Sequence, residues 1–568
     1  MIMNQSFYIG RTILQIISCS ILFLGACSKN NNAINRGTTF DTSSIAHIPL
    51  VDEMPDIPVN YHLIDWNQRA KDFDSFIFDG TKSGQYLPII KTDNTNKTFK
   101  MPAYVGINLQ DGAEEAVANM QAVLGASLAG IDKSNQNGMD YVTQIQVYKN
   151  RENVITNNPN QLSAGLEFWY ALLPTVEFGA LTDLYAKVPG MRDIMKTVAD
   201  RWYEAVVSLG GSNVNFSHTG YDFATMKPFD RRYGNGGAWI EPDAAAGVGI
   251  FLYWAYQAFH DGKYLDGASW CANFLANLPF APSYETLIIW GPLLGARLNA
   301  EQAQKHNIAK LMAQVFNESS DARQGWGMRV GTWGGYGADG LIGAKDNSDG
   351  YAFAMNSFLA PMGIAPVARY DQRFARDIGK WILNVASNAR LFYADQLPAT
   401  NQEPVVWSGD PEHVIPYEGL RNFYMNQSPY ATGDPTHYGW GPTDFGIYSG
   451  APSGVLGGII RSTDVDKILQ IDILKTDFFH AAAYPSYLYF NPYRESKTVT
   501  IDGSNKTYDL YDAVTDNYLK TGVTGSTTFS IPALGAVVLV LVPANGKRVH
   551  NSNGTIVIDN VFVAFRTK

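Results

Sequence analysis

The feature of this sequence that most constrains its fold is a long succession of helical segments without a short repeat. Between about Tyr61 and Ile460, apolar residues recur at helical spacing in segments of roughly 12–20 residues. Glycine, proline and asparagine separate these segments. The predicted starts are Ile64, Gly112, Met139, Gly165, Gly190, Pro242, Lys263, Tyr284, Ala300, Gly350, Asp371 and Ser449. Because no repeat of about 34–47 residues is found, six helical hairpins closed into an (α/α)6 toroid are expected, with an open solenoid as the alternative.

After about Val465 the pattern changes from helices to strands. β-Branched and aromatic runs are separated there by Asp-Gly, Thr-Gly and Asn-Gly turns. The runs are 488–493, 497–501, 508–512, 527–531, 536–542 and 555–558. The sequence therefore predicts a mainly α fold, with an (α/α)6-toroid catalytic domain over 56–464 and a β-sandwich accessory domain over 465–568.

The N-terminus has the pattern of an export signal. Arg11 precedes an apolar run over 13–24 that polar residues interrupt, so the run is too short to remain as a membrane-spanning helix. The sequence Leu24-Gly25-Ala26-Cys27 resembles the bacterial lipobox, in which the cysteine thiol takes a diacylglycerol. Residues 1–27 are expected to be a lipoprotein signal peptide and 28–55 a tether. An ordinary signal peptide with a chance cysteine is the alternative.

These features predict an extracytoplasmic protein that a lipid on Cys27 holds to the bacterial outer membrane, on its periplasmic or surface face. After export and lipidation only Cys271 is left as a free thiol, so no intrachain disulfide is expected. The formal net charge of −10 and the lack of a basic run argue against a nucleic-acid partner. Membrane contact is expected through the lipid alone.

Metal and cofactor motifs are not found in the sequence. The nine histidines include no pair at i, i+4 and no His-Glu-x-x-His. No glycine-rich phosphate motif follows a strand, and no Gly-x-Ser-x-Gly elbow is present. Neither a metal nor an organic cofactor is therefore expected.

The composition is aromatic and rich in glycine, with 31 Tyr, 29 Phe, 12 Trp and 52 Gly against 17% charged residues. Sugar-binding clefts use such side chains, because the apolar face of a pyranose stacks on a ring. Core packing in a large helical protein is the alternative use of these rings.

The whole architecture resembles a group of known enzymes. A lipidated chain with a toroid-like body and a C-terminal sandwich is similar to the carbohydrate-active enzymes of glycan-degrading Bacteroidetes. The segments 508–512 and 531–538 resemble the accessory sandwiches that end many glycoside hydrolases. Toroids of this kind include hydrolases, polysaccharide lyases and enzymes that do not act on sugars, so the resemblance implies a glycan substrate without fixing the reaction.

Three loops are too long for a plain hairpin and are expected to carry the chemistry. The first, 217–243, ends at a predicted helix start. Glu241 is its best catalytic candidate, because Trp239 and Pro242 can raise its pKa toward that of a general acid. A carboxylate that only complements the helix dipole is the alternative. The other candidates in this loop are Asp222, Arg232, Tyr233, Trp239 and Asp243.

The second and third loops supply further aromatic and acidic side chains. Loop 321–350 contains a glycine-rich stretch with candidate sugar platforms and one acid, namely Trp326, Trp333, Tyr336 and Asp339. Loop 393–444 offers Glu418 and Asp444 as the second carboxylate. Its candidate substrate-binding residues are His413, Tyr417, His437 and Trp440. A toroid brings the loops at one rim together, so distance along the sequence is no objection.

The sequence therefore predicts a glycoside hydrolase that cleaves an oligo- or polysaccharide by carboxylate acid/base chemistry. A polysaccharide lyase is the second hypothesis. It needs a Tyr or His base and an Arg or Asn to neutralise the uronate, and the candidate groups are Tyr233 with Arg232, or His413 with Tyr417 and Arg421. The third hypothesis is a lipid-anchored glycan-binding protein without catalysis, which keeps the aromatic platforms but needs no convergent carboxylates.

The lipobox gives a first prediction. Since lipidation requires the thiol, Cys27→Ser is expected to move the protein out of the membrane fraction of its host cells, and fractionation with immunoblotting measures this. Cys271→Ser is the matched control and is expected to stay with the membranes. Membrane association that survives the loss of Cys27 contradicts the lipoprotein hypothesis.

Overall fold

The structure is a computed structural model and describes most of the chain after its N-terminal segment. It covers residues 45–93, 98–107, 115–234, 236–317, 325–344, 350–404, 407–503 and 505–566. The predicted signal peptide, the lipid site at Cys27 and residues 28–44 of the predicted tether lie outside the described residues. Among the described residues, no helix combines the length and the apolar character that crossing a bilayer requires.

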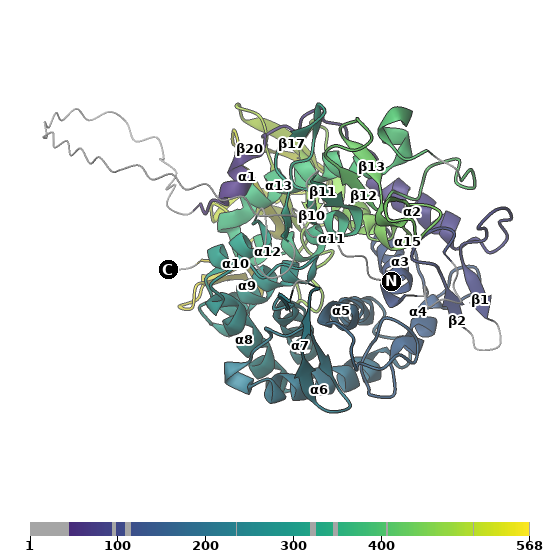
Figure 1. Cartoon of the computed structure of the whole chain (residues 1–568). Helices are drawn as coiled ribbons and strands as arrows, with labels where there is room; N and C mark the ends of the chain where they lie inside the picture. Colours follow the sequence, from purple (N-terminus) through teal and green to yellow (C-terminus); the bar gives the residue numbers. More distant parts are fainter. Residues whose placement is uncertain are drawn as a thin grey trace, which may run out of the picture. The chain divides into compact units, whose positions relative to one another are not determined.

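Inner helices close a ring in which each one packs against the next. They are α3 (Ala116–Leu128), α5 (Phe168–Leu184), α7 (Ala244–Phe259), α9 (Trp290–Gln302), α11 (Ala354–Ile364) and the consecutive pair α15 (Ile447–Gly450) and α16 (Ser453–Ile459). In Figure 1 the labels α3, α5, α7, α9, α11 and α15 follow one another around a common centre. The sequence explains the inner position, because helices such as α7 are apolar on every side and are buried along most of their length.

Outer helices alternate with the inner ones along the chain and cover them from outside. They are α2 (Trp66–Ile77), α4 (Tyr141–Gln144), α6 (Met191–Ser208), α8 (Gly262–Asn277), α10 (Ile308–Val315) and α13 (Ala375–Asn388). Unlike the inner helices, α6 is buried on one face only, through residues such as Met191, Met195 and Trp202. A helix begins within about six residues of every predicted start except Ala300, which lies inside α9 and before the start of α10 at Ile308. Because α16 returns to α2 and α3, the chain forms a closed double ring and not an open solenoid.

The ring closes through a glycine contact between α3 and α16. A Cβ atom on Gly454 would fall onto the backbone of Gly125, and one on Gly125 would fall onto the carbonyl of Ala451, both far inside van der Waals distance. Only glycine allows the two backbones to approach so closely. The contact between the first and the last inner helix therefore depends on these two residues.

Short antiparallel strands occupy the loops between the helices. The paired strands are β1 (Lys91–Asp93) with β2 (Thr98–Lys100), β3 (Gly220–Asp222) with β4 (Lys227–Phe229), β5 (Arg231–Arg232) with β6 (Ala238–Trp239), β7 (Trp326–Met328) with β10 (Ile342–Ala344), and β8 (Thr332–Trp333) with β9 (Tyr336–Gly337). A three-stranded sheet joins β11 (Tyr351–Phe353), β12 (Gly419–Arg421) and β13 (Tyr430–Thr432). The short helices α1 (Pro49–Glu53), α12 (Val367–Tyr370) and α14 (Asp434–His437) complete this part.

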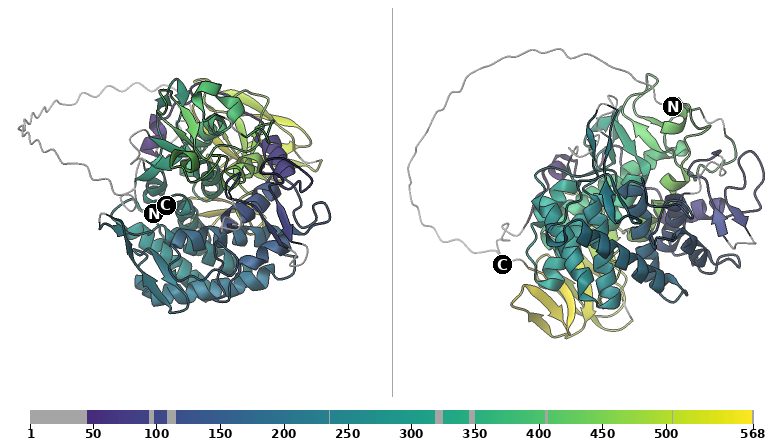
Figure 2. Two further views of the ribbon diagram at one scale, coloured as in Figure 1. Left: turned by 45° about the vertical axis from the view of Figure 1, so that its right-hand side comes forward. Right: turned by 60° about the horizontal axis from the view of Figure 1, so that its bottom comes forward.

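The C-terminal region is built on an antiparallel six-stranded sheet of order β14-β15-β16-β21-β18-β19. Its strands are β14 (Ile460–Ser462), β15 (Leu469–Asp472), β16 (Ser486–Phe490), β18 (Tyr508–Asp512), β19 (Asn517–Val523) and β21 (Ala536–Pro543). A two-stranded sheet of β17 (Lys497–Ile501) and β20 (Thr527–Ile531) and a three-stranded sheet of β22 (Arg548–His550), β23 (Thr555–Ile558) and β24 (Val561–Phe565) follow. Figure 2 shows these yellow strands gathered beside the helices.

The predicted β-sandwich is not confirmed. The six-stranded sheet and the β17–β20 pair share an apolar layer that includes Tyr489, Val499 and Phe529. The strands β16 and β21, however, also pack against helix α13. These two strands are buried at most positions, as in a sheet covered on both faces. The β17–β20 pair covers one face of the six-stranded sheet and α13 covers the other, in place of the two full sheets of a sandwich.

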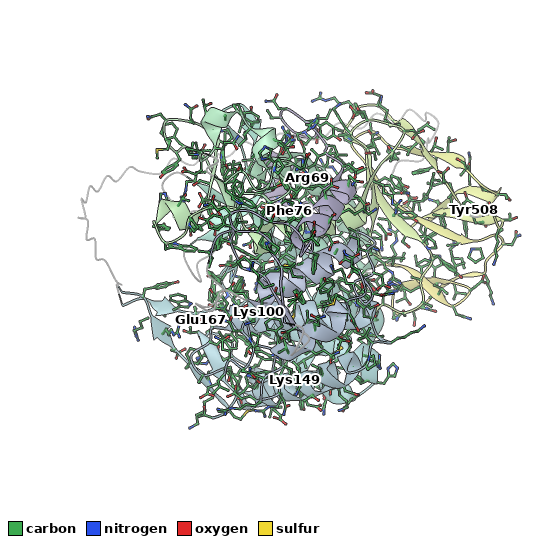
Figure 3. All side chains as sticks on the ribbon, turned by 90° about the vertical axis from the view of Figure 1, so that its right-hand side faces the viewer. Arg69, Phe76, Lys100, Lys149, Glu167 and Tyr508 are labelled. Carbon is green, nitrogen blue, oxygen red and sulfur yellow. The ribbon has the colours of Figure 1, made fainter. Side chains whose placement is uncertain are left out.

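Buried ion pairs join the C-terminal region to the ring. Asp477 is almost fully buried and lies 2.6 Å from Nη1 of Arg369, while Nη1 of Arg297 on α9 lies 3.5 Å from its other oxygen. The hydroxyl of Tyr370 donates to Asp477 at 2.7 Å. Residues 45–568 form one compact unit. Figure 3 shows Tyr508 on the sheet at one side of this unit and Arg69 and Phe76 on α2.

The glycine contact gives a prediction about stability. Gly454→Ala is expected to lower the free energy of unfolding by about 1–3 kcal/mol or more, because the added methyl group overlaps the backbone of α3. Gly262→Ala on α8 is the matched control, since a Cβ there meets nothing within 4 Å. Urea unfolding of both variants measures the difference, and equal stability would mean that closure does not depend on Gly454.

Candidate active site

One end of the ring gathers the starts of the inner helices around a cavity of about 470 Å³. Residues at or just before the first turn of five inner helices line it. They are Glu115 before α3, Trp169 in α5, Glu285 before α9, Phe353 before α11 and Tyr448 in α15. The helix N-termini make this end of the ring electrostatically positive, which favours acidic side chains.

The cavity combines carboxyl groups with aromatic walls. Its four carboxyl groups are Glu115, Glu285, Glu418 and Asp434. The aromatic lining residues are Tyr104, Trp169, Tyr170, Trp326, Tyr351, Phe353, Tyr438, Trp440 and Tyr448. Among the described residues that line the cavity there is no lysine, arginine or histidine. Such a site suits a ligand with apolar faces and hydroxyl groups, and it suits proton transfer between carboxyl groups and ligand.

Glu418 is the most tightly held of these carboxyl groups. It precedes β12, and its Oε1 accepts from the hydroxyls of Tyr104 and Tyr448, the latter at 2.7 Å. Its Oε2 accepts from the hydroxyl of Tyr351 at 3.0 Å and from the backbone N–H of Asp434. Burial raises the pKa of Glu418 to about 7, with a further contribution from the negative charge of Asp434, although these donors oppose the shift.

Asp434 is the carboxyl group beside Glu418 that remains accessible. It is the first residue of α14, and 42% of its side chain is exposed. Burial raises its pKa, and Arg421, whose Nη2 lies 3.3 Å from Asp434 Oδ1, opposes that shift. Because a guanidinium stays protonated in proteins, the buried Arg421 holds a positive charge next to this carboxylate. Asp434 is thus suited to act in its ionised form.

Glu115 lines the same cavity from the N-cap position of α3. Burial raises its pKa to about 7, and a hydrogen bond from Asn157 only partly opposes this. At neutral pH a large share of Glu115 is therefore protonated, as a general acid requires.

Glu241 and Asp243 flank the start of α7 and hold the neighbouring loops in place. Glu241 is fully buried, and its two oxygens accept from the backbone N–H of Trp169 at 2.8 Å and from Nε1 of Trp239 at 3.0 Å. Asp243 is also fully buried and accepts from the backbone N–H of Tyr284 at 2.9 Å. Neither carboxyl group is among the cavity lining. The two carboxylates hold the backbone of Trp169, which lines the cavity, and of Tyr284, which precedes Glu285.

The three remaining acidic candidates lie in turns and loops. Asp444 is buried behind Glu418 and accepts from the backbone N–H of Thr436 at 2.9 Å, which stabilises α14. Asp339 is buried and accepts from the backbone N–H of Gly331 at 2.8 Å. Asp222 forms a turn with Thr225, whose hydroxyl donates to it at 2.8 Å. None of the three lines the cavity.

Of the aromatic and basic candidates, Trp326 and Trp440 line the cavity. Trp333 is buried, whereas Trp239 is half-buried and stacks on Tyr233 with 5.1 Å between ring centroids. Tyr336 pairs with Trp333 in the small β8–β9 hairpin. The other candidates lie outside the cavity lining. Arg232 donates to the carbonyl of Gly236, and the carbonyl of His413 accepts from Arg69. The ring of Tyr417 stacks on that of Phe445, and the ring of His437 contacts those of Tyr424 and Tyr438.

The sequence-based prediction did not include Glu115, Glu285 or Asp434. Glu115 carries the same signal as Glu241, an acid just before a helix in the inner ring. Asp434 stands before Pro435, which is typical of a helix start, and this signal was available in the third loop. The segment before α9 carries Glu285 in a left-handed backbone conformation with φ of 52°, which the sequence does not indicate.

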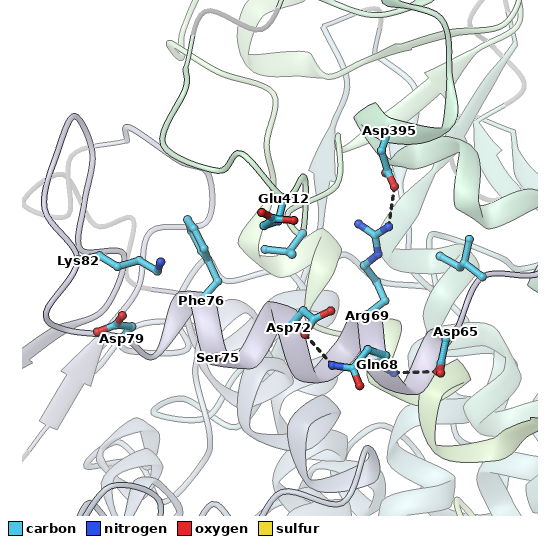
Figure 4. Close-up of a pocket in the computed structure, with 12 residues that line it drawn as sticks. Asp65, Gln68, Arg69, Asp72, Ser75, Phe76, Asp79, Lys82, Asp395 and Glu412 are labelled. Carbon is cyan, nitrogen blue, oxygen red and sulfur yellow. Dashed lines mark hydrogen bonds and ion pairs between the residues drawn. The ribbon is translucent and has the colours of Figure 1, made fainter.

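A second groove lies on the outer helix α2 and is lined by Gln68, Arg69, Asp72, Asp395 and Glu412 among others (Figure 4). Its charged groups bind one another, since Arg69 pairs with Asp395 and Gln68 donates to Asp72, both at 2.8 Å.

Within the described part of the chain, the one group with metal-ligand spacing is His47, Asp52 and Asp377. Arg376 already pairs with both of these aspartates, at 3.0 Å and 2.6 Å.

Comparison with known proteins gives only weak likenesses. No protein-family model matches the chain, and no curated protein matches it. The cellobiose 2-epimerase from Bacillus thermoamylovorans B4167 matches at 9% identity, with 69% of this chain and 98% of that chain covered and a TM-score of 0.39. A GH127 β-L-arabinofuranosidase from Geobacillus stearothermophilus T6 matches at 11% identity, 87% and 79% coverage and a TM-score of 0.28.

A third solved structure, the endoglucanase CelQ from Clostridium thermocellum, matches at 9% identity, with 89% and 100% coverage and a TM-score of 0.32. Likenesses of this strength do not establish a family for the chain. Its function therefore has to be inferred from the chemistry of its own cavity.

The position of Glu241 gives a prediction. In Glu241→Gln the amide group faces one of two donors, the N–H of Trp169 or of Trp239, so the free energy of unfolding is expected to fall by about 1–3 kcal/mol. Asp222→Asn, at an accessible turn, is the matched control and is expected to change stability by less than about 0.5 kcal/mol. Chemical unfolding measures both. Unchanged stability together with a turnover loss of a hundredfold would assign Glu241 to the chemistry instead.

Proposed function

We propose that this chain is a hydrolase that cleaves the glycosidic bonds of an oligo- or polysaccharide. The observation that carries the proposal is that two carboxyl groups line one aromatic-walled cavity: Glu115, whose pKa burial raises to about 7, and Asp434, which lies 3.3 Å from the guanidinium of Arg421. Glycoside hydrolysis requires one protonated and one ionised carboxyl group at the scissile bond. The cavity supplies both.

Glu115 is proposed as the general acid. Because burial raises its pKa to about 7, it holds a proton at neutral pH and donates it to the leaving oxygen. Asp434, ionised beside Arg421, is proposed to activate water or to attack the anomeric carbon. Glu418 is proposed as a positioning residue, because its four hydrogen bonds fix the Tyr104, Tyr351 and Tyr448 hydroxyls and the start of α14.

A polysaccharide lyase is less well supported by this cavity. Lyase chemistry needs a cation to neutralise the uronate and a base to abstract a proton, and the described cavity lining has no basic side chain. Burial and the charge of Glu418 raise the pKa values of Tyr351 and Tyr448 well above the ordinary range, so these phenols are poor bases. A binding protein without catalysis would not need a buried carboxyl group with a pKa raised to about 7 in the same cavity as a second carboxyl group.

The proposal includes export and a lipid anchor on Cys27 at the bacterial outer membrane. The lipobox-like sequence supports that part. It is independent of the catalytic proposal, because the cavity is formed by residues after Ala103.

The test uses the protein from Ser28 onward on a panel of neutral, amino and uronic-acid glycans. New reducing ends without absorbance near 235 nm are expected. Glu115→Gln and Asp434→Asn are each expected to reduce turnover by about a hundredfold or more, because the amides cannot transfer a proton. Asp222→Asn is the control that should retain wild-type turnover. Absorbance near 235 nm would indicate a lyase, and full turnover in Glu115→Gln would contradict the assigned roles.

The proposed roles also predict how kcat/KM depends on pH, and the same variants test this. The general acid must be protonated, so kcat/KM is expected to fall as the pH rises through about 7, the pKa of Glu115. In Glu115→Gln the residual activity should lose this alkaline limb, whereas Glu418→Gln should retain it. Measurement of kcat/KM between about pH 5 and 9 separates the two glutamates.

A further inference from the structure

Four of the nine large apolar side chains that are exposed in the described part of the chain lie between residues 423 and 440, and two of these four line the cavity. Phe423, Met425, Tyr438 and Trp440 have 52%, 61%, 62% and 52% of their surfaces exposed. Most other large apolar side chains in the described part of the chain are buried. Four such exposures within one short stretch form a patch of the kind that marks a binding surface.

The local backbone explains why these side chains point outward. Tyr424 and Gln427 exchange two backbone hydrogen bonds, of 3.0 Å and 2.9 Å, around a tight turn at Met425 and Asn426. Tyr424 turns inward, where its ring lies 5.3 Å from that of Tyr430. Met425 stands in the turn itself, with φ of 48°, and Phe423 lies just before the turn, so both side chains face solvent.

The patch continues from the cavity. Trp440 and Tyr438 line the cavity, and Trp440 contacts Tyr104, which donates to Glu418, with ring centroids 5.3 Å apart. The loop with Phe423 is tied to Tyr438 by contacts of His437, whose ring lies 5.2 Å from Tyr424 and 4.6 Å from Tyr438.

The chemistry of this stretch selects among possible ligands. No charged residue occurs from Asn422 to Gly433, and the polar side chains there include Asn422, Asn426 and Gln427. Amides beside apolar faces suit the hydroxyls and the apolar face of a neutral pyranose. An anionic lipid surface or a sulfated chain would require basic side chains instead.

We propose that Phe423, Met425, Tyr438 and Trp440 form a platform that binds a neutral glycan chain as it leaves the cavity. The platform extends the proposed hydrolase site, on which this inference rests, and makes polymeric chains better substrates than short glycosides. Sugar units beyond the scissile bond stack on its apolar faces.

The test separates polymer binding from cleavage. In a Glu115→Gln background, native electrophoresis in gels with hydroxyethylcellulose, arabinoxylan, galactomannan or laminarin measures affinity, with polygalacturonate as the anionic probe. At least one neutral polymer is expected to retard the protein. The Phe423→Ala/Met425→Ala variant is expected to lose about tenfold in that affinity. Leu184→Ala/Val207→Ala, which also truncates two exposed apolar side chains, is the matched control and should bind as the parent does.

In the catalytically intact chain, Phe423→Ala/Met425→Ala is expected to lower kcat/KM for the retained polymer about tenfold more than for a nitrophenyl glycoside. Equal losses on both substrates, no retardation by any neutral polymer, or unchanged polymer affinity would overturn the platform. A monomer–dimer shift in the variant would assign the patch to a second copy and also overturn it. Cleavage that persists in Glu115→Gln would refute the catalytic roles and leave the binding result intact.

Discussion

The approach of two helix backbones at Gly125 and Gly454 determines where the rest of the molecule lies. It brings the last inner helix beside the first and thereby closes the ring. Closure forces the helix starts at one end to surround a common space, and residues far apart in the sequence meet there. Glu115 and Asp434 both line this space. A chain with the same helices in an open array would have the same carboxyl groups but no shared cavity.

Helix N-termini at that end leave backbone N–H groups that need acceptors, and carboxylates are the strongest acceptors available. The structure uses its acids there in two ways. Glu241 and Asp243 are fully buried, and their carboxylates accept hydrogen bonds from backbone N–H groups of neighbouring segments. These two acids therefore stabilise the structure. Glu115 and Asp434 face the cavity, where burial raises the pKa of both carboxyl groups and the positive charge of Arg421 opposes that shift at Asp434. The same residue type therefore serves either packing or chemistry according to its neighbours.

The helices and most C-terminal strands were predictable because their signals are local. Helical spacing located the members of both rings to within a few residues, apart from α10, whose predicted start at Ala300 falls inside α9. The runs 497–501, 508–512 and 527–531 coincide with β17, β18 and β20. The sequence could not predict which element covers the six-stranded sheet. Strands buried on both faces have the same apolar pattern whether a second sheet or helix α13 packs on them. Glu241 and Glu115 also share one local signal, an acid at a helix start. Only the ring geometry, which depends on contacts between distant segments, shows which of them lines the cavity.

Aromatic side chains of the same type lie both in the core and at the candidate site. Trp333 is buried in a hairpin, Trp326 is buried at the cavity wall, and Trp440 is half exposed at its mouth. One ring inside the wall, Tyr351, lies 4.8 Å from the guanidinium of Arg421, which pairs with Asp434. The exposure of rings at the mouth, by contrast, costs free energy unless a ligand covers them. Exposed rings that lie beside acid/base carboxyl groups, close to a stretch from Asn422 to Gly433 without charged residues, are therefore best explained by a neutral glycan that runs across them.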